Sequence, residues 1–281
     1  MTQARDARLA AIVDHLVDIG SASAKSLAER FAVSVMTVHR DLDELEQRGL
    51  VRKFHGGASV TRTGNYEIAA AIRRRLAQAQ KQAMAAVALR SVRDGQAIII
   101  DDSTTAASMI DPLLRSGLTV RVISNYLPVL TALARSTRVT SQAIGGDYDR
   151  SHESYLGVGA VEAAASLRPD IVFLSSTTAD ARGVYHQEER VVSLKQEMLR
   201  SGRHRVLLMD ETKLGTTSLY RIGGWDLVDE LITTTDAPQD LLGRIEDQNV
   251  VVTRVPVRAH GREDATGTPG PTQTASANAS R

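Results

Sequence analysis

The stretch AKSLAERFAVSVMTVHRDL, residues 24–42, constrains the fold of this chain more than any other segment. Leu27 and Phe31 give a first short helix an apolar side, and Val38 and Leu42 give a second helix its own. Only three or four residues separate the two helices, so they must meet in a tight turn. This is the layout of a helix-turn-helix, in which the second helix enters the major groove of DNA.

The second helix, expected over residues 34–48, carries outward-facing side chains that can contact DNA. Ser34 stands where this helix needs an N-cap. The candidate DNA contacts on it are Ser34, Met36, Thr37, His39 and Arg40. An arginine can bond in two places to a guanine edge or a phosphate, and Thr37 is short enough to allow close approach. His39 by itself could equally face solvent and contact nothing.

The flanking segments complete a winged domain. Apolar residues at i, i+3, i+4, i+7 and i+8 from Leu9 mark an amphipathic helix before the motif, and Gly49 fits a helix C-cap after it. Two short strand-like runs around Gly56-Gly57 then predict a β-hairpin, the wing. Its candidate phosphate contacts are Arg52, Lys53 and His55. We expect an α+β winged helix-turn-helix over residues 1–61.

The alternative for this unit is a small helical domain that binds protein. Such a domain would expose several large apolar side chains, whereas Met36 is the only large one on the outward side of the second helix. DNA binding is therefore the favoured interpretation.

Residues 62–80 form a connector, with Gly64 as a breaker and Arg73, Arg74 and Arg75 on a short linker helix. A run of three arginines usually lies on a solvated face. The alternatives are contact with DNA phosphate or with a partner subunit.

From Lys81 onward, helical segments alternate with short β-branched runs. Strands are predicted at 97–101, 119–124, 170–175, 205–210 and 230–235, and helices at 106–115, 126–135, 158–167 and 187–201. Such alternation implies an α/β domain, over 81–258, with a parallel sheet covered on both faces. Several strands end in polar residues, and ligands bind at the carboxyl ends of strands in open sheets. Residues 259–281 lack large apolar side chains, so we expect a disordered tail.

Two strand ends carry candidate ligand-binding residues. Asp101, Asp102, Ser103, Thr104 and Thr105 end a buried strand and begin a helix, where hydroxyls and free amides favour a phosphate. The two carboxylates would accept hydrogen bonds from sugar hydroxyls. At another strand end, Asp210 and Lys213 add a cation that could complete an anion site. The plainer alternatives are that Ser103 only caps its helix and that Lys213 forms a surface ion pair.

A pair of glycines, Gly145-Gly146, follows a strand and could let the backbone approach a ligand. On its own, the pair is equally typical of a turn.

The composition excludes several classes of protein. There is no cysteine, which rules out disulfides and thiolate metal sites and favours a reducing cytoplasm. The first residues lack the apolar core of a signal peptide, and nowhere do about 18 uncharged apolar residues run together to cross a membrane. The net charge of +1 neither requires nor forbids nucleic acid, so DNA binding must depend on where the charges lie.

These features together resemble the DeoR family of bacterial transcription regulators, over about residues 5–255. The motifs that carry the resemblance are VSVMTVHRDL, ELEQRGLVRKFHGGA, DDSTT, SNYL, GG, DIVFL, LKQEM, MDETKLG and TTD, in that order. The family's sensor half is similar to ribose-5-phosphate isomerase. The resemblance implies a sugar-phosphate effector held by Asp101, Ser103, Thr104, Thr105, Asn125, Gly145, Gly146, Lys195, Asp210 and Lys213.

This chain departs from the family pattern at three places. His39 stands where a basic residue is usual, Ser103 where glycine is usual, and Val191 where an acidic residue is frequent. The first departure implies an altered half-site preference. The other two imply an altered effector or weaker binding of phosphate.

The expected protein is a cytoplasmic transcription regulator, a repressor of a sugar-catabolism operon that a sugar phosphate relieves. It would bind double-stranded operator DNA as a homodimer or homotetramer, because one winged domain covers few base pairs. We expect no cofactor, no metal site and no catalytic residues. The alternative is a sugar-phosphate isomerase with an accessory DNA-binding domain, for which Asp101, Asp102 and Asp210 are the candidate bases.

Overall fold

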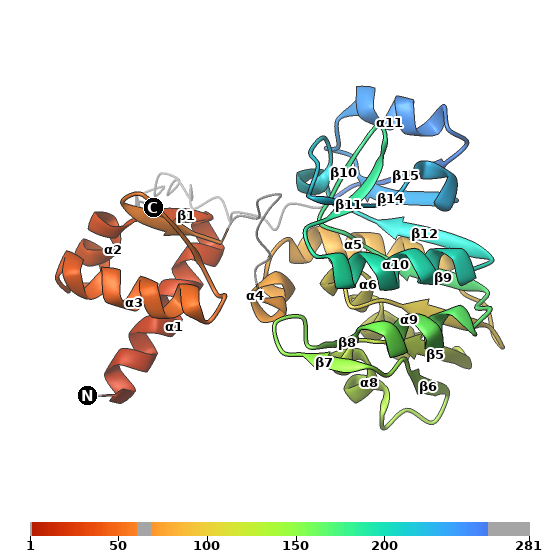
Figure 1. Ribbon diagram of the computed structural model, residues 1–281, viewed down its shortest axis with the longest axis horizontal. Coiled ribbons are helices and arrows are strands. Elements are labelled where there is room, and N and C mark those ends of the chain that lie inside the picture. The colour runs from red at the N-terminus through yellow and green to blue at the C-terminus, as the bar shows by residue number, and fades with distance from the viewer. Residues whose placement is uncertain (1, 61–68, 258–281) are drawn as a thin grey trace, which may run out of the picture.

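We analysed the protein in a computed structural model that describes residues 2–60 and 69–257, with side chains from residue 5 onward. The predicted breaker Gly64, the last wing residue Thr61 and the predicted tail at 259–281 lie outside these described residues. Figure 1 shows an N-terminal helical unit, a larger α/β unit, and the short helix α4 (Ala70–Arg75) between them.

The N-terminal unit consists of three helices and a small antiparallel sheet. Its elements are α1 (Thr2–Ile19), β1 (Ser21–Ser23), α2 (Ala24–Phe31), α3 (Val35–Gln47), β2 (Arg52–Phe54) and β3 (Gly57–Ser59). The three strands lie in the order β1-β3-β2. The predicted winged helix-turn-helix is therefore confirmed, with β1 as a third strand that the sequence did not indicate.

Capping residues fix where α3 begins and ends. The Ser34 hydroxyl accepts a hydrogen bond from the Thr37 amide at 3.1 Å, as an N-cap should. Beyond the last turn, Gly49 adopts φ +68°, and its amide donates to the carbonyl of Glu46. The Leu50 amide donates to the carbonyl of Leu45, which completes a Schellman motif. The predicted C-cap role of Gly49 is confirmed.

The wing differs from the prediction by one residue. Its two-residue turn is His55-Gly56, with Gly56 at φ +86°, and Gly57 belongs to β3, where it pairs with Phe54. A side chain at Gly57 would come within 2.3 Å of the Ala22 carbonyl on β1. Gly57 is therefore required by the close approach of the third strand rather than by the turn.

The α/β unit is built on a seven-stranded, wholly parallel sheet. Its strands are β4 (Ala97–Ile100), β5 (Val120–Ser124), β6 (Val139–Ala143), β9 (Ile171–Leu174), β12 (His204–Leu208), β14 (Glu230–Thr234) and β15 (Val251–Val255). They lie in the order β15-β14-β12-β9-β4-β5-β6. The chain thus moves outward from β4 in one direction and later from β9 in the other. The boundary between β4 and β9 is the topological switch point, where open α/β sheets bind ligands.

Helices cover both faces of this sheet (Figure 1). They are α5 (Gln78–Ala88), α6 (Thr104–Ala107), α7 (Ile110–Ser116), α8 (Leu127–Leu133), α9 (Val158–Ala165), α10 (Glu189–Ser201) and α11 (Gln239–Glu246). The core under α9, α10 and α11 includes Ile99, whereas Ile98 and Ile100 point into the core under α5, α7 and α8. This alternation along β4 is the period-two pattern of a strand buried on both sides.

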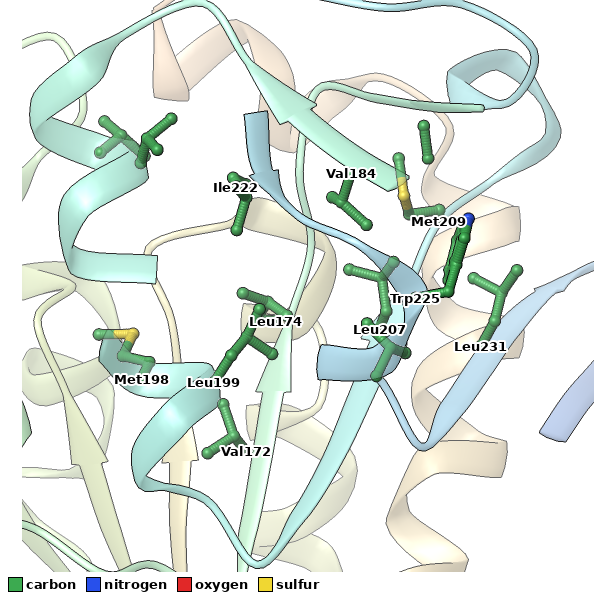
Figure 2. Close-up of a cluster of buried hydrophobic side chains, with 14 of the residues drawn as sticks. Val172, Leu174, Val184, Met198, Leu199, Leu207, Met209, Ile222, Trp225 and Leu231 are labelled. Carbon is green, nitrogen blue, oxygen red and sulfur yellow. The ribbon is translucent and has the colours of Figure 1, made fainter. Parts of the chain in front are cut away.

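Two small antiparallel sheets and three short helical turns complete the unit. The sheets are β7 (Asp147–Asp149) with β8 (Ser154–Leu156), and β10 (Thr178–Asp180) with β11 (Gly183–His186) and β13 (Tyr220–Gly223). The turns are 3-10 helices at Leu89–Ser91, Glu211–Lys213 and Trp225–Leu227. Figure 2 shows Trp225, Met209 and Leu231 packed together in the core under α9, α10 and α11, and the Trp225 indole donates to the Asp180 carbonyl at 2.9 Å.

All five predicted strands and the predicted helices of this unit are present, with one interruption. The predicted helix 106–115 is divided into α6 and α7. At the break, the Ser108 hydroxyl donates to the carbonyls of Thr105 and Lys81, which competes with continuous helical hydrogen bonding. The part of the chain that the structure describes contains no helix long and apolar enough to cross a membrane.

Candidate functional site

The outer side of α3 presents a mixed apolar and basic surface. Met36 is 64% exposed, Arg40 is exposed, and His39 is half-buried. Among the described residues, the Arg40 side chain has no hydrogen-bond or ion-pair partner. The Ser34 and Thr37 hydroxyls lie 2.9 Å apart, so both are engaged in capping the helix. Arg40 and Met36 are thus the predicted contacts that reach furthest outward.

Asp41, which sequence reasoning missed, fixes α3 against α1. Its carboxylate is buried and accepts hydrogen bonds from Arg8 at 2.7 Å and from Arg5 at 3.3 Å. A signal for it existed, because Asp41 lies three residues after Val38, on the buried stripe of the helix. A buried carboxylate needs a partner of opposite charge. The orientation of Arg40 depends in turn on this anchoring.

The three wing residues do not share one environment. Arg52 and His55 are exposed, as contacts with phosphate require. Lys53 instead forms an ion pair with Asp43, and its amide donates to the Glu46 carboxylate at 2.7 Å. We conclude that Lys53 attaches the wing to α3, which leaves its charge largely neutralised.

A polar cavity lies at the switch point of the large sheet, where β4 and β9 end. Thirteen residues line it: Arg73, Asp102, Ser103, Thr104, Thr105, His152, Ser175, Ser176, Thr177, His186, Val191, Lys195 and Lys213. The side chains that follow β4 and β9 are mostly hydroxyls, and the other elements add cations and imidazoles. Hydroxyls and cations in one enclosed space can hold an anionic, hydroxylated molecule.

Lys195, from α10, is buried between the two carboxylates that follow β4. Its ammonium bonds Asp101 and lies 2.9 Å from Asp102. Burial alone would raise the pKa of Asp102, but the charges of Lys195 and His152 lower it below its usual range. Burial would lower the pKa of Lys195, and the two carboxylates raise it instead. Asp102 and Lys195 therefore stay ionised at neutral pH, and both face the cavity.

Lys213 also lines the cavity and is not at the surface. Its ammonium donates to the Ser175 hydroxyl at 2.7 Å and to the Thr105 hydroxyl at 3.1 Å. The Asp210 carboxylate lies 3.9 Å away and caps the following turn through the Thr212 amide. The alternative of a surface ion pair for Lys213 is therefore wrong, because the side chain is only 3% exposed.

Two of the predicted side chains after β4, Ser103 and Asp101, hold the site in shape, and only Ser103 also lines the cavity. The Ser103 hydroxyl accepts from the Ala106 amide at 3.1 Å, which is the capping role. Asp101 accepts from the amides of Ser103 and Ser175 and so joins the ends of β4 and β9. Asp101 does not line the cavity itself. It supports the site by orienting Lys195 and the two strand ends.

Four more of the predicted effector residues, two threonines and two glycines, differ in whether they reach the cavity. Thr104 and Thr105 line the cavity, whereas Gly145 and Gly146 do not. Gly146 adopts φ +141°, and a side chain there would come within 2.5 Å of the Leu156 carbonyl. This glycine is needed for packing against β8.

Asn125 also lies outside the cavity lining. Its amide nitrogen donates to the Tyr155 carbonyl at 3.1 Å, while its buried side-chain oxygen has no hydrogen-bond partner among the described residues. Asn125 therefore ties β5 to the β7–β8 hairpin next to the site.

Sequence reasoning missed two histidines of the lining. His152 is buried on the β7–β8 hairpin, and its Nε2 lies 2.8 Å from the Glu188 carboxylate. Burial lowers the pKa of His152, but the hydrogen bond to Glu188 and the charge of Asp102 raise it above its usual value. His186 ends β11 and its Nδ1 accepts from the Glu188 amide. Neither histidine stands in a recognisable motif, because loops distant in sequence bring them to the cavity.

The linker helix α4 supplies another unexpected member of the lining. The interpretation of the three arginines as a solvated face is wrong for Arg73, which is 7% exposed and lines the cavity. Arg74 donates to the Tyr126 hydroxyl at 2.8 Å and pairs with Glu153. Arg75 pairs with Asp14 of α1 at 2.7 Å. Three consecutive arginines thus contact three separate places.

A helix-turn-helix unit joined to an α/β unit with a polar cavity defines the class of DNA-binding transcription regulators. Two family models match the sequence: "DeoR-like helix-turn-helix domain" over residues 8–63 and "DeoR C terminal sensor domain" over residues 76–235. The second match covers more than half of the chain. The chain therefore belongs to the DeoR family of transcription regulators.

Similar proteins include both a transcriptional activator and a transcriptional repressor. The uncharacterized HTH-type transcriptional regulator YgbI of Escherichia coli K12 is 28% identical over 81% of this chain and 89% of that protein. The L-fucose operon activator of the same strain is 27% identical, over 81% and 94%. The glycerol-3-phosphate regulon repressor of Escherichia coli K12 is 24% identical over 85% of this chain and 94% of that protein.

Among solved structures, a ribose 5-phosphate isomerase A from Methanocaldococcus jannaschii is 18% identical, with a TM-score of 0.35 over 48% of this chain and 53% of that one. The α/β fold class itself follows from the strand order of the sheet.

The isomerase alternative is wrong, because the chain belongs to a family of regulators. The geometry agrees with this correction. A general base should have a pKa close to neutrality, whereas Lys195 and His152 lower the pKa of Asp102 despite its burial. Asp101 is bonded to Lys195, and Asp210 accepts from the Thr212 amide and hydroxyl.

Proposed function

We propose that this protein is a cytoplasmic repressor of a sugar-catabolism operon, and that a sugar phosphate releases it from operator DNA. The observation that carries the proposal is the cavity at the β4–β9 switch point, which combines ammonium groups, an ionised carboxylate and a row of hydroxyls. Two relatives, a glycerol-3-phosphate regulon repressor and an L-fucose operon activator, support the substrate class.

The effector would bind through two kinds of contact. Lys213, Thr104 and Thr105 would form the phosphate side of the cavity, where the Lys213 ammonium lies 3.1 Å from the Thr105 hydroxyl. Asp102 and Lys195 form the sugar side, because an ionised carboxylate accepts hydrogen bonds from sugar hydroxyls and an ammonium donates to them. Asp101, Asp210 and Asn125 hold these groups in place without touching the ligand.

DNA binding would use α3 in the major groove and the wing on the backbone. Arg40 and Met36 reach base edges, and Arg52 and His55 contact phosphates. Since one such unit covers few base pairs, the protein acts as a homodimer or homotetramer on repeated half-sites. The effector can shift DNA affinity only by as much as its own affinity differs between the two arrangements of the protein.

A paired ligand panel tests this function. The full chain is screened by thermal shift with glycerol 3-phosphate, ribose 5-phosphate and fructose 6-phosphate, each next to its unphosphorylated parent. A ligand at 100 times its Kd stabilises the folded state by about 2.7 kcal/mol, so a true effector raises Tm by several degrees. The same compound should weaken binding to a duplex selected from a random DNA pool by the wild-type protein.

The variant Arg40→Ala tests DNA binding separately from effector binding. It should lose roughly tenfold or more in affinity for the selected duplex, since a bidentate arginine contact contributes about 1–3 kcal/mol. It should keep the full thermal shift with the effector, because Arg40 lies on a separate unit. The proposal fails if no phosphorylated compound of the panel shifts Tm, or if Arg40→Ala binds the duplex as the wild type does.

A further inference from the structure

Arg73 is the one cavity residue that comes from the linker helix. Its guanidinium Nη2 lies 3.4 Å from Nδ1 of His152. Its carbonyl accepts hydrogen bonds from the buried ammonium of Lys81 and from the Thr104 hydroxyl. Both the side chain and the backbone of Arg73 are therefore part of the wall of the cavity, next to the residues that follow β4.

The chemistry of this position suits an anion. A guanidinium presents paired N–H donors that match two oxygens of a phosphate, and it keeps its charge when buried. The lining holds two further cations: Lys195, whose ammonium lies between two carboxylates, and Lys213, which lies 3.9 Å from Asp210. Arg73 and the neighbouring His152 bring positive charge to the α4 side of the cavity.

The cavity is too small for an effector in the arrangement described. The volume open to the centre of a water-sized sphere is about 20 Å³, while a single water needs roughly 10–15 Å³. A phosphate group is much larger than a water, so its binding must displace part of the lining. Most lining residues are on the large sheet, α10 or short loops packed on them. Arg73 instead has a long side chain on a helix of six residues.

The opposite side of α4 belongs to the N-terminal unit. Ile72 is 4% exposed and packs in the same apolar cluster as Leu9, Leu27 and Val51. The amide of Ala69, just before α4, donates to the carbonyl of Gly49 at the end of α3. The Arg75–Asp14 ion pair adds a contact with α1. A displacement of Arg73 therefore acts directly on the unit that carries the DNA-reading helix.

We propose that Arg73 is a ligand for the anionic group of the effector, and that its engagement shifts α4 and thereby changes the affinity of the N-terminal unit for DNA. This assignment rests on the proposed function, because it presupposes an anionic effector in the cavity. It identifies one residue that belongs to the effector site and, through its neighbour Ile72, to the DNA-binding unit.

The test uses the full chain with inorganic phosphate and glycerol 3-phosphate as probes. Calorimetric titration compares the wild type with Arg73→Gln, Arg73→Lys and the control Arg115→Gln, which removes one exposed positive charge on α7. Arg73→Gln should weaken binding of the probe at least about tenfold, as expected for a lost charge-assisted hydrogen bond. Arg73→Lys should lose less, and Arg115→Gln should stay within about twofold.

The second readout is the effect of the probe on binding to the selected duplex. In the wild type, saturating probe should lower DNA affinity, and in Arg73→Gln the duplex affinity should no longer respond to the probe. If Arg73→Gln binds the probe as the wild type does, or if the response of DNA affinity survives in this variant, the assignment of Arg73 is overturned while the proposed function stands. If the wild type binds neither probe nor any sugar phosphate, the proposed function fails with it.

Amide hydrogen exchange on the wild-type protein tests the same proposal without any substitution, so it does not depend on whether a variant folds. Saturating phosphate should change the exchange of the amides of residues 70–76, and a peptide from α11 should not respond. Unchanged exchange across residues 70–76 at saturation would overturn the proposal.

Discussion

At the scale of single residues, the charge of the cavity is set by how its buried ionisable side chains are paired. Asp102 and Lys195 neutralise one another at 2.9 Å, and each would be costly to bury alone. His152 stands apart, because its protonation is set by Glu188 and Asp102 on one side and by Arg73 on the other. The charge of the cavity therefore depends on pH through His152 more than through the Asp102–Lys195 pair.

The stability of the protein should carry a pH dependence from His152. Burial lowers the pKa of His152, yet Glu188 and Asp102 raise it above its usual value, and the unfolded value is about 6.5. A raised pKa in the folded state means that protonation stabilises the fold. This stabilisation is complete below about pH 6.5 and disappears as the pH rises through the folded-state pKa.

The measurement is Tm as a function of pH for the wild type and His152→Gln. The wild type should lose more Tm than the variant between pH 6 and pH 9, after correction with His55→Gln, an exposed histidine of the wing. Asp149, His186 and Arg73 also face this histidine, and the difference in Tm between the wild type and His152→Gln isolates the contribution of His152 itself. Parallel pH profiles for the two proteins would contradict the assignment.

At the scale of elements, the ends of helix α3 determine how the neighbouring segments are placed. α3 begins at a serine cap and ends in a Schellman motif that turns the chain directly into the wing. The carbonyl of Gly49 then receives the amide of Ala69, so this end also receives the linker segment. One left-handed residue thus sets the position of the recognition helix, the wing and α4.

Two glycine-to-alanine substitutions should act in opposite directions. Gly49 adopts φ +68°, so Gly49→Ala forces a side chain into the left-handed region and should cost about 1–2 kcal/mol. Gly243 lies inside α11 with open space where a Cβ would be, so Gly243→Ala should stabilise by roughly 0.5–1 kcal/mol. Thermal unfolding of both variants checks this, and equal signs would show that the cap is not the reason for glycine at position 49.

At the scale of the whole molecule, the N-terminal unit has no net charge to attract DNA. Residues 5–60 contain eight lysines and arginines and eight aspartates and glutamates. Arg5, Arg8, Arg48 and Lys53 are paired within this unit. The exposed cations of this range that lack an ion-pair partner among the described residues are Lys25, Arg30, Arg40 and Arg52. Within residues 5–60, association with DNA must rely on these few groups.

The salt dependence of DNA binding should therefore be shallow. Each neutralised phosphate adds about −0.9 to the slope of log K against log salt concentration, so the slope should be no steeper than about −4 per protomer. Arg52→Gln should reduce it by about one, whereas Lys53→Gln should leave it nearly unchanged, because Lys53 is paired with Asp43. Fluorescence anisotropy with the selected duplex at several salt concentrations measures both. A steeper slope, or equal effects of the two neighbours, would refute this charge distribution.

The sequence was sufficient for the winged unit, the five central strands and the residues after β4, since apolar periodicity and strand-end polarity are local signals. The edge strand β6 was missed because it is largely polar and exposed, as unpaired edges tend to be. His152 and His186 were missed because only the folded loops bring them to the cavity. Arg73 was misjudged because its neighbours Arg74 and Arg75 do face outward, and composition cannot distinguish one arginine in such a run.

The adjacency of Ile72 and Arg73 limits how this protein could be recombined with its relatives. A hybrid that takes the N-terminal part up to residue 60 leaves Ile72 behind, and so opens the apolar core of that part. A hybrid joined after residue 76 carries Arg73 away from the cavity in which it is buried. The two units are therefore not freely interchangeable modules, and a working chimaera would need a linker helix whose two consecutive residues suit one parent each.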